Sequence, residues 1–527
     1  MFIFNLILIF FFAVSANAAE REAKPGSYLV KCKKGASDSE LAALHQKAHA
    51  VVIKKFFIPV GLYLIQVDAG ASFEEAENLY RSDPLVDYIE PNYDTHVQAQ
   101  VNDPLFPIQW ALGPRGVNIE SAWSKTMGDR SIVVGLIDTG IDYTHPDLYR
   151  NIWKNSLEIP GNGVDDDKNG YIDDIYGINA ITGSGDPMDD NDHGTHMAGI
   201  IGAEGNNQIG ISGVSPKVSI AACKFMNADG KGDIASAITC LNYFAELADR
   251  SIEPVTIIAT NNSWVAGYRP SEAFFAALKE HQKRGILFIA AANTRGNNND
   301  ILPVYPANLT LSNVISVTAH DADGKVLQGA NIGKRSVHVA APGADIISTV
   351  AQGKYAYLSG TSTATAHVSG AAALLKASDT SLDWISIKNL LIDSGKPLTD
   401  KEMKTLSGRQ IRMWDSSGFG ALTCKDQTIN ARLKPVGDII VMKLGESLAL
   451  SVIDINCAHA SAKTLLTVLQ GPTNSSIRIG LNDQGEKGDD WPNDGVFNGQ
   501  FTPVAKGKYQ LHFPTSFDKK VLVTVTN

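Results

Sequence analysis

The middle of the chain alternates continuous apolar runs with stretches of helical spacing. The apolar runs are short enough to be buried strands, and they cover residues 131–138, 218–225, 255–263, 286–292 and 314–318. Helical spacing occurs between them, at 234–248 and 271–285. Buried strands that alternate with helices are typical of a mostly parallel sheet with helices on both faces, so we predict an α/β fold for this region.

The segments on either side of this region have different patterns. Before it, strand-like runs at 28–33, 61–67 and 86–92 alternate with two stretches of helical spacing, which predicts a small α+β module. After it, from about residue 433, short runs separated by turn residues predict a β-sandwich of roughly 100 residues. The strands expected there cover residues 438–443, 447–453, 464–469, 476–481, 508–513 and 520–526.

The N-terminus is strongly apolar from Met1 to Val14, and the small residues that follow reach an Ala-x-Ala pattern at Ala18. This pattern predicts a secretory signal peptide, and therefore export to the extracellular space or the periplasm. Because the run carries no early Lys or Arg, an uncleaved membrane anchor is the alternative, but the run is shorter than the ~20 residues of a membrane span. The predicted domains are a signal peptide at 1–18, an α+β module at 20–100, an α/β domain at 102–425 and a β-sandwich at 433–527.

Composition and charge narrow the class of protein. A chain of 527 residues is too long for one hydrophobic core, and its 44% hydrophobic and 19% charged residues are those of a globular protein. The formal net charge of −10, without a dense Lys/Arg stripe, argues against nucleic-acid binding. Export permits disulfides, and we would test Cys223–Cys240 and Cys424–Cys457 first, since Cys32 would leave with a removed N-terminal segment.

Three motifs carry groups suited to catalysis. Asp138 ends a buried strand within Val-Gly-Leu-Ile-Asp-Thr-Gly, His193 begins His-Gly-Thr-His, and Ser362 follows Gly-Thr ahead of a helical run. An acid, a histidine and a serine together permit nucleophilic attack, because the histidine takes the hydroxyl proton and the carboxylate orients the imidazole. Taken alone, Ser362 is interpreted as a helix N-cap. The other motifs favour catalysis, as does the position of Asp138, Ser263 and Asn293 at the carboxyl ends of predicted parallel strands.

At these motifs, in the chain order Asp, His, Ser, the sequence resembles the subtilisin-like serine peptidase family over roughly residues 102–423. The resemblance implies a serine endopeptidase that forms an acyl-enzyme intermediate. It assigns Asp138 as the triad acid, His193 as the general base and Ser362 as the nucleophile. It also assigns the side chain of Asn293 to the oxyanion hole.

The same resemblance implies the residues that bind substrate. The strand ending in Ser263, Trp264 and Val265 would pair with the peptide and wall the pocket for the residue before the cut. Val265 and Ala292 stand where the family has glycine, and both add volume to that wall. We therefore expect a narrow pocket that favours smaller or slimmer P1 residues. His196, which could pair with His193 on a metal, is interpreted as structural.

A further motif, at residues 162–174, is rich in Asp, Asn and Gly. Its alternating oxygen donors and its glycine match the early part of an EF-hand-type loop, which predicts a structural Ca²⁺. The predicted ligands are Asp165, Asp167, Asn169, Tyr171, Asp173 and Asp174. The final glutamate of such loops is missing, so Asp173 or Asp174 would end the site; an ordinary surface turn is the alternative. Four acids of the C-terminal region are interpreted as a solvated cluster: Asp483, Asp489, Asp490 and Asp494.

The expected partners are protein or peptide substrates and the chain's own N-terminal segment. By the resemblance, residues 20–100 form an inhibitory propeptide that the enzyme cuts between Thr95 and Asn102. We expect a monomer that binds no nucleic acid and meets a membrane only if the signal is uncleaved. One alternative is a catalytically silent scaffold, which the intact catalytic residues disfavour. The other is an enzyme whose β-sandwich serves surface attachment or substrate capture.

Overall fold

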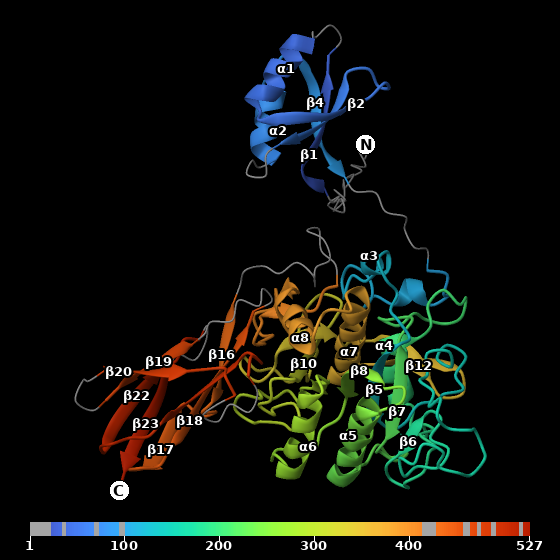
Figure 1. Cartoon of the computed structure of the whole chain (residues 1–527), viewed down its shortest axis with the longest axis vertical. Helices are drawn as coiled ribbons and strands as arrows, with labels where there is room; N and C mark the ends of the chain where they lie inside the picture. Colours follow the sequence, from blue (N-terminus) through green and yellow to red (C-terminus); the bar gives the residue numbers. More distant parts are fainter. Residues whose placement is uncertain are drawn as a thin grey trace, which may run out of the picture. The chain divides into compact units, whose positions relative to one another are not determined.

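The computed structural model describes residues 23–33, 38–67, 73–93, 101–413, 428–456, 464–471, 476–485, 492–515 and 520–527 (Figure 1). The chain divides into two compact units, residues 1–97 with 416–418, and residues 98–415 with 419–527. The predicted signal peptide and the pairing of Cys424 with Cys457 lie outside the described residues. None of the described helices has both the length and the apolar character that crossing a membrane requires.

The first unit is an α+β module, as predicted. Its four strands lie in the order β2-β3-β1-β4, and the buried residues Val30, Ile65, Tyr80 and Ile89 belong to its core. The free thiol of Cys32 is buried in the same core. Its elements are β1 (Ala23–Cys32), α1 (Asp38–Lys47), β2 (Ala50–Lys55), β3 (Leu62–Val67), α2 (Phe73–Arg81) and β4 (Val86–Tyr93).

The second unit is built on a nine-stranded sheet in the order β14-β15-β11-β10-β9-β8-β5-β7-β6. All neighbours from β11 to β6 are parallel, which confirms the predicted α/β fold. The strands are β5 (Ile132–Asp138), β6 (Gly177–Asn179), β7 (Ser219–Lys224), β8 (Thr256–Asn262), β9 (Leu287–Ala291), β10 (Val314–His320), β11 (Val339–Pro342), β14 (Lys396–Pro397) and β15 (Arg409–Gln410). A separate hairpin joins β12 (Ile346–Val350) and β13 (Lys354–Leu358).

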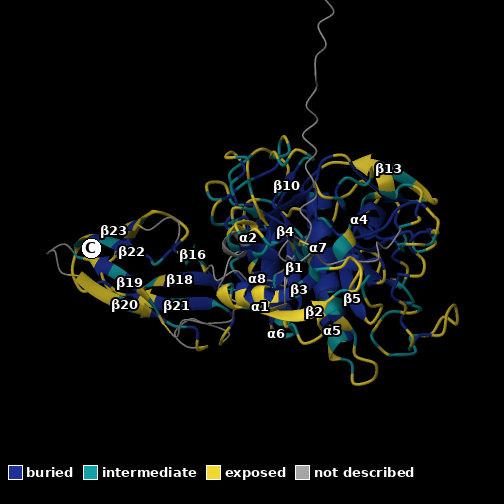
Figure 2. Cartoon of the chain, turned by 90° about the horizontal axis from the view of Figure 1, so that it is seen from above, coloured by how far each residue is buried: buried dark blue, intermediate teal, exposed yellow. Residues whose placement is uncertain are grey.

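Helices pack on both faces of this sheet because successive side chains of a strand point in opposite directions. Val134 and Leu136 of β5 join the core formed with α4, α7 and α8, while Val133 and Ile137 join the core formed with α5 and α6. In Figure 2, α7 is mostly dark blue, as expected for a helix held against the sheet. The helical elements are η1 (Phe106–Ile108), α3 (Glu120–Trp123), α4 (His193–Gly202), α5 (Ile234–Asp249), α6 (Glu272–Lys283), α7 (Thr361–Ser378) and α8 (Trp384–Asp393).

A disulfide joins Cys223 of β7 to Cys240 of α5. It confirms the first of the two expected pairings and fixes the helix to the sheet at a point where both residues are buried.

The C-terminal strands form two sheets around one core, as predicted for a β-sandwich. Leu450 and Phe497 of the smaller sheet share a core with Leu511 and Val523 of the larger one. The first sheet holds β16 (Ile429–Lys434), β18 (Leu448–Ile455) and β21 (Val496–Phe501). The second holds β17 (Ile439–Lys443), β23 (Lys520–Thr526), β22 (Gly507–His512), β19 (Leu465–Gln470) and β20 (Ser476–Leu481). Strands β16 and β21 were not predicted; the Asn-Gly pair inside β21 is a turn signal that pairing with β18 overrides.

Candidate active site

The carboxylate of Asp138 and the imidazole of His193 meet at the carboxyl ends of the central strands. Asp138 is the last residue of β5, and its Oδ1 accepts a hydrogen bond of 2.7 Å from His193 Nδ1. The carboxylate is buried, with 1% of its side chain exposed, whereas 29% of the histidine side chain is exposed. An imidazole held at Nδ1 in this way presents Nε2 as the basic nitrogen.

Electrostatics favour the protonated imidazole of His193. Burial lowers its pKa, but the charge and hydrogen bond of Asp138, with the charge of Asp189, raise it by more, so the pKa of His193 lies above its ordinary 6.5. The same charges stabilise the imidazolium that forms when the histidine takes a proton.

Gly140, in the motif of Asp138, and Gly194, in the motif of His193, allow the backbones of these two motifs to come into contact. A Cβ on Gly140, whose φ is +110°, would lie 2.3 Å from the carbonyl oxygen of Pro187. A Cβ on Gly194 would lie 2.0 Å from the carbonyl oxygen of Gly140. Both distances are shorter than any tolerated contact, so the close approach that lets Asp138 reach His193 requires glycine at both positions.

Asp189 is a buried acid that joins the ends of these two motifs. Its Oδ1 accepts a hydrogen bond of 2.8 Å from Thr139 Oγ1, and its Oδ2 accepts one of 2.9 Å from the Thr195 N–H. It therefore connects the residue after Asp138 with the first turn of α4. Asp189 was not among the predicted site residues; an acidic pair just ahead of the histidine motif is its signal in the sequence.

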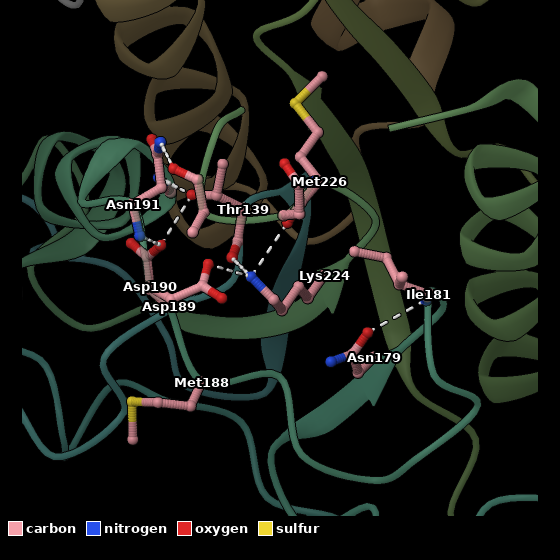
Figure 3. Close-up of polar contacts among 12 residues, drawn as sticks. Thr139, Asn179, Ile181, Met188, Asp189, Asp190, Asn191, Lys224 and Met226 are labelled. Carbon is pink, nitrogen blue, oxygen red and sulfur yellow. Dashed lines mark hydrogen bonds and ion pairs between the residues drawn. The ribbon is translucent and has the colours of Figure 1, made fainter. Parts of the chain in front are cut away.

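Lys224 connects the same loops from the neighbouring strand (Figure 3). Its ammonium is buried and donates hydrogen bonds to the carbonyl of Thr139 at 2.7 Å, to Asp190 Oδ1 at 2.6 Å and to the carbonyl of Met226 at 3.0 Å. In the β5–β7 register, Lys224 lies directly opposite Asp138. Lys224 was also not predicted, although a lone charged residue near the end of an apolar run is a recognisable signal.

Ser362 lies in the first turn of α7, where the sequence predicts it. Its Oγ donates a hydrogen bond of 3.1 Å to the carbonyl of Ser263, and Ser263 Oγ donates one of 3.0 Å to the carbonyl of Ser362. These bonds fix the start of α7 to the residue after β8, and β8 is the neighbour of β5 in the sheet. The structure thus brings Asp138 and His193 into contact and ties Ser362 to the adjoining strand end; within the described residues, no hydrogen bond joins Ser362 to His193.

Asn293 follows the next strand, β9, with a φ of +88° that is unusual for a residue other than glycine. Its Oδ1 accepts a hydrogen bond of 2.8 Å from the N–H of Thr294, and Thr294 Oγ1 accepts one of 3.2 Å from the N–H of Thr361. Through Thr294, these two hydrogen bonds hold the Asn293 side chain beside the start of α7. Among the described residues none accepts a hydrogen bond from Asn293 Nδ2, so this amide can donate to a developing oxyanion.

The residues predicted to wall the substrate pocket lie at the ends of β8 and β9. The Trp264 ring packs against the rings of Phe225 and Phe274, with centroids 4.9 and 5.7 Å apart, so it lies in the hydrophobic core. Ala292 is fully buried, whereas 36% of Val265 is exposed. Of these three side chains, Val265 is the one accessible from the surface.

His196 has the structural role that the sequence interpretation gives it. The ring is buried, and its Nε2 lies 3.1 Å from the carbonyl oxygens of both Ile346 and Ala356. Burial lowers the pKa of His196 to about 4, so the ring is neutral and its Nε2 donates to these carbonyls. His196 therefore stabilises the hairpin of β12 and β13, and its Nε2 is used for this and not for a metal.

The acidic loop gathers three carboxylates. One oxygen from each of Glu158, Asp165 and Asp167 lies within 4.8 Å of the others. Glu158 was not predicted, because it precedes the loop by several residues and belongs to no spacing pattern. Carboxylate oxygens at this separation fit the hard-oxygen coordination of Ca²⁺.

The other predicted acids of the loop have different partners. Asp173 accepts hydrogen bonds from the N–H groups of Gly161 and Gly163 at 2.7 and 3.0 Å. Asp174 accepts them from Tyr243 Oη at 2.7 Å and from Asn155 Nδ2 at 2.9 Å. Burial raises the pKa of Asp174 to about 6, and these hydrogen bonds oppose that rise. Both carboxylates therefore stabilise the fold of the loop, and Asn155 Nδ2 joins Asp174 to Asp167 of the cluster by hydrogen bonds of 2.9 and 3.0 Å.

Arg250 offsets part of the negative charge beside this cluster. Its Nη2 lies 2.8 Å from Asp167 Oδ2, and both side chains are largely buried. Of the remaining predicted ligands, the Asn169 side chain accepts a hydrogen bond from the N–H of Tyr171 at 2.8 Å. Asp167 thus belongs both to the three-carboxylate cluster and to the ion pair with Arg250.

Two family models match the chain. One, described as the subtilase family, matches residues 129–410. The other, described as the fervidolysin N-terminal prodomain, matches residues 13–92. The first match contains Asp138, His193 and Ser362, and the second contains most of the N-terminal α+β module.

Curated relatives cover a similar part of the chain. Subtilisin-like protease 1 of Plasmodium berghei (strain Anka) is 31% identical over 342 residues, which are 61% of this chain and 55% of the relative. A thermophilic serine proteinase of Bacillus sp. (strain AK1) is 35% identical over 294 residues, which are 56% of this chain and 64% of the relative. The matches therefore span between about half and two thirds of these relatives' own lengths.

Two solved structures are also similar. A cold adapted subtilisin-like serine proteinase is 25% identical with a TM-score of 0.42, over 53% of this chain and 88% of that one. A protease from Pseudoalteromonas arctica is 22% identical with a TM-score of 0.48, over 61% of this chain and 98% of that one. By the family match over more than half of its length, this chain belongs to the subtilase family.

Proposed function

We propose that the chain is a serine endopeptidase in which Ser362 is the nucleophile, His193 the general base and Asp138 the acid that orients the base. The observation that carries this proposal is the 2.7 Å hydrogen bond between Asp138 and His193, at the sheet edge to which Ser362 is tied. Membership of the subtilase family supports the same reaction class.

In the proposed mechanism, His193 Nε2 takes the proton of Ser362 Oγ as that oxygen attacks the scissile carbonyl. The developing oxyanion is stabilised by Asn293 Nδ2 and by the backbone N–H of Ser362 in the first turn of α7. His193 then gives its proton to the leaving amine, and water hydrolyses the acyl-enzyme through the same base. Asp138 keeps the imidazole in the required tautomer throughout.

A fluorophosphonate probe tests this function directly, because it labels only a serine that an adjacent base activates. We expect the probe to label the mature protein and to leave the Ser362→Ala variant unlabelled, with Ser251→Ala, a change at an exposed serine, as the matched control. If wild-type protein with a native fold is not labelled, the chain is a silent scaffold rather than a peptidase.

We also propose that residues 20–100 are an inhibitory propeptide, that residues 1–18 direct export, and that the enzyme cuts its own precursor between Thr95 and Asn102. The match to a prodomain family over residues 13–92 supports this reading. Expression of Ser362→Ala in a host without a suitable protease should accumulate uncut precursor. Normal maturation of that variant would contradict self-processing.

A structural Ca²⁺ is part of the proposal. Glu158, Asp165 and Asp167 would hold it, with the Asn169 and Tyr171 oxygens as neutral ligands, and it would neutralise the loop's converging carboxylates. We further propose that the substrate pocket is narrowed at Val265 and Ala292 and selects slim P1 residues. A peptide-library profile dominated by Phe, Tyr or Leu at P1 would contradict the narrow pocket.

A further inference from the structure

A line of hydroxyl and amide side chains connects the middle of α7 with the end of β8 and ends on the backbone of Ser362. Ser369 Oγ donates a hydrogen bond of 3.0 Å to Asn261 Oδ1, and Asn261 Nδ2 donates one of 3.0 Å to Ser263 Oγ. Ser263 Oγ in turn donates to the Ser362 carbonyl at 3.0 Å. Asn261 and Ser369 are fully buried, and Ser263 is 6% exposed. The three side chains are therefore shielded from water.

The periods of strand and helix bring these residues together. Asn261 and Ser263 are two residues apart, which places their side chains on one face of an extended segment. Ser362 and Ser369 are seven residues apart, which is two turns of α7, so they lie on one side of the helix. The neighbours of Asn261 in register on β5 and β9 are Leu136 and Ile289, which belong to the core beneath α7. An amide in such a core is costly unless it is hydrogen-bonded.

The last acceptor sets the direction of every hydrogen bond in this line. A carbonyl oxygen only accepts, so the hydroxyl proton of Ser263 points at the Ser362 carbonyl. Ser263 Oγ then accepts from Asn261, which requires the amide NH₂ on that side and Oδ1 on the side of Ser369. The hydroxyl proton of Ser369 is therefore directed at Asn261, although the Thr365 carbonyl also lies 3.1 Å from Ser369 Oγ.

The contact between Ser263 and Ser362 changes during the proposed reaction. In the free protein it consists of two reciprocal bonds, because Ser362 Oγ also donates to the Ser263 carbonyl at 3.1 Å. Ser362 Oγ gives up this bond when it loses its proton to His193. The bond from Ser263 Oγ to the Ser362 carbonyl then remains to hold the nucleophile at the end of β8. The amide of Asn261 maintains that bond, since it directs the Ser263 proton at the carbonyl.

We propose that Asn261 and Ser369 are positioning residues for the peptidase reaction, which act on Ser362 through the hydroxyl of Ser263. The inference rests on the proposed function of Ser362 as the nucleophile. Removing Ser369 Oγ takes away the donor that fixes the orientation of the Asn261 amide, so the Ser263 proton is no longer directed at the Ser362 carbonyl. A nucleophile held less firmly reacts more slowly, whereas substrate binding is little affected.

Steady-state kinetics of Ser369→Ala, Ser263→Ala and the double variant test this proposal. Each single variant should lower kcat by about 10-fold and change KM by less than about two-fold. The double variant should have the kcat of Ser263→Ala, because Ser369 acts through Ser263. Ser316→Ala is the matched control and should retain the wild-type kcat. Ser316 is a fully buried serine of β10 whose Oγ has no hydrogen-bond partner among the described residues.

Denaturant unfolding separates the positioning role from a purely structural one. The double variant should be less stable than either single variant, because it leaves both ends of the Asn261 amide without a side-chain partner, although its kcat falls no further. An unchanged kcat in Ser369→Ala overturns the proposal, as does a double variant whose loss of kcat is the product of the two single losses. If Ser369→Ala does not fold, Ser369→Cys, whose thiol is a weaker donor, replaces it and the same outcomes decide.

Fluorophosphonate labelling distinguishes failure of this inference from failure of the proposed function. The labelling rate should fall with kcat in Ser369→Ala and stay unchanged in Ser316→Ala. Equal labelling rates in wild type and Ser369→Ala overturn the positioning role and leave Ser362 as the nucleophile. Folded wild-type protein that the probe does not label overturns the proposed function, and this inference with it.

Discussion

The Lys224 ammonium donates a hydrogen bond of 2.7 Å to the carbonyl of Thr139, the residue that follows Asp138. Its bond to Asp190 reaches the segment that leads into His193. One buried lysine therefore links the loops of the acid and the base, although it touches neither catalytic side chain. Lys224 is a positioning residue in this arrangement.

Replacing Lys224 with Met should lower kcat by up to about 100-fold with little change in KM, because small displacements of catalytic groups carry penalties of that order. The unpaired Thr139 carbonyl should also reduce the free energy of unfolding by about 1–3 kcal/mol. Steady-state kinetics and urea unfolding measure both effects. Lys231→Met, a change at an exposed lysine, is the control, and an unaltered kcat in Lys224→Met would refute the positioning role.

Replacing Asp138 with Asn should lower kcat by about 10⁴-fold while the protein stays folded, the magnitude known for this change in another serine protease. The amide can stabilise neither the imidazolium of His193 nor its required tautomer. Kinetics with circular dichroism separate this effect from unfolding. Asp229→Asn, at an exposed acid, should retain full activity, and a loss of only a few-fold in Asp138→Asn would contradict the assigned role.

The pH profile of kcat/KM should have an acid limb set by His193. The base acts only when neutral, and its pKa is raised, so activity should fall as the pH drops through a value above 6.5. The raised pKa of His193 also makes the stability of the folded state depend on pH. The folded state binds this proton more tightly, so the proton's contribution to the unfolding free energy is full below pH 6.5 and is lost as the pH rises through the raised pKa. A limb below pH 6.5 would contradict this electrostatic account.

Removing calcium should lower the unfolding temperature of the mature enzyme, because among the described residues Arg250 alone then offsets the negative charge of Glu158, Asp165 and Asp167. Scanning calorimetry with and without chelator measures the shift. The Glu158→Gln/Asp165→Asn variant should show a smaller chelator response than wild type. An equal response in both would place the relevant ion elsewhere.

Removing the disulfide between Cys223 and Cys240 should reduce the free energy of unfolding by about 3 kcal/mol, the loop-entropy value for a closed loop of this size. The sequence separation is 17 residues. Denaturant unfolding of the Cys223→Ala/Cys240→Ala variant, in the Ser362→Ala background, checks this value. Cys32→Ala in the precursor is the control for losing a buried thiol, and equal stability with and without the disulfide would rule out a stabilising role.

The predictable part of the fold follows from local patterns. Apolar runs such as 131–138 and 286–292 are buried on both faces, so their composition alone distinguishes them from surface strands. Strand β21 escaped prediction because its Asn-Gly pair is read locally as a turn, whereas its pairing with β18 is set by contacts distant in sequence.

The residues of the candidate active site also fall into two groups, those that local sequence patterns predict and those that they do not. Motif spacing predicted Asp138, His193 and Ser362 as candidate site residues, because each lies in a locally distinctive segment. Glu158, Asp189 and Lys224 were missed, since each acts across strands or loops that come together only in the folded chain. The residues next to them in the sequence do not indicate which residues they contact in the folded chain.

The sequence by itself determined the proposed reaction class and the elements that present its groups, since the proposed nucleophile, base and acid are recognised by residue type and motif. The tertiary structure alone decided which carboxylates converge. It brought Glu158 together with Asp165 and Asp167, and it gave Asp173 and Asp174 their hydrogen-bond partners Gly161 and Tyr243. The physical reason is that burial and the distance between charges depend on how segments distant in sequence pack together, and local residue spacing does not determine this packing.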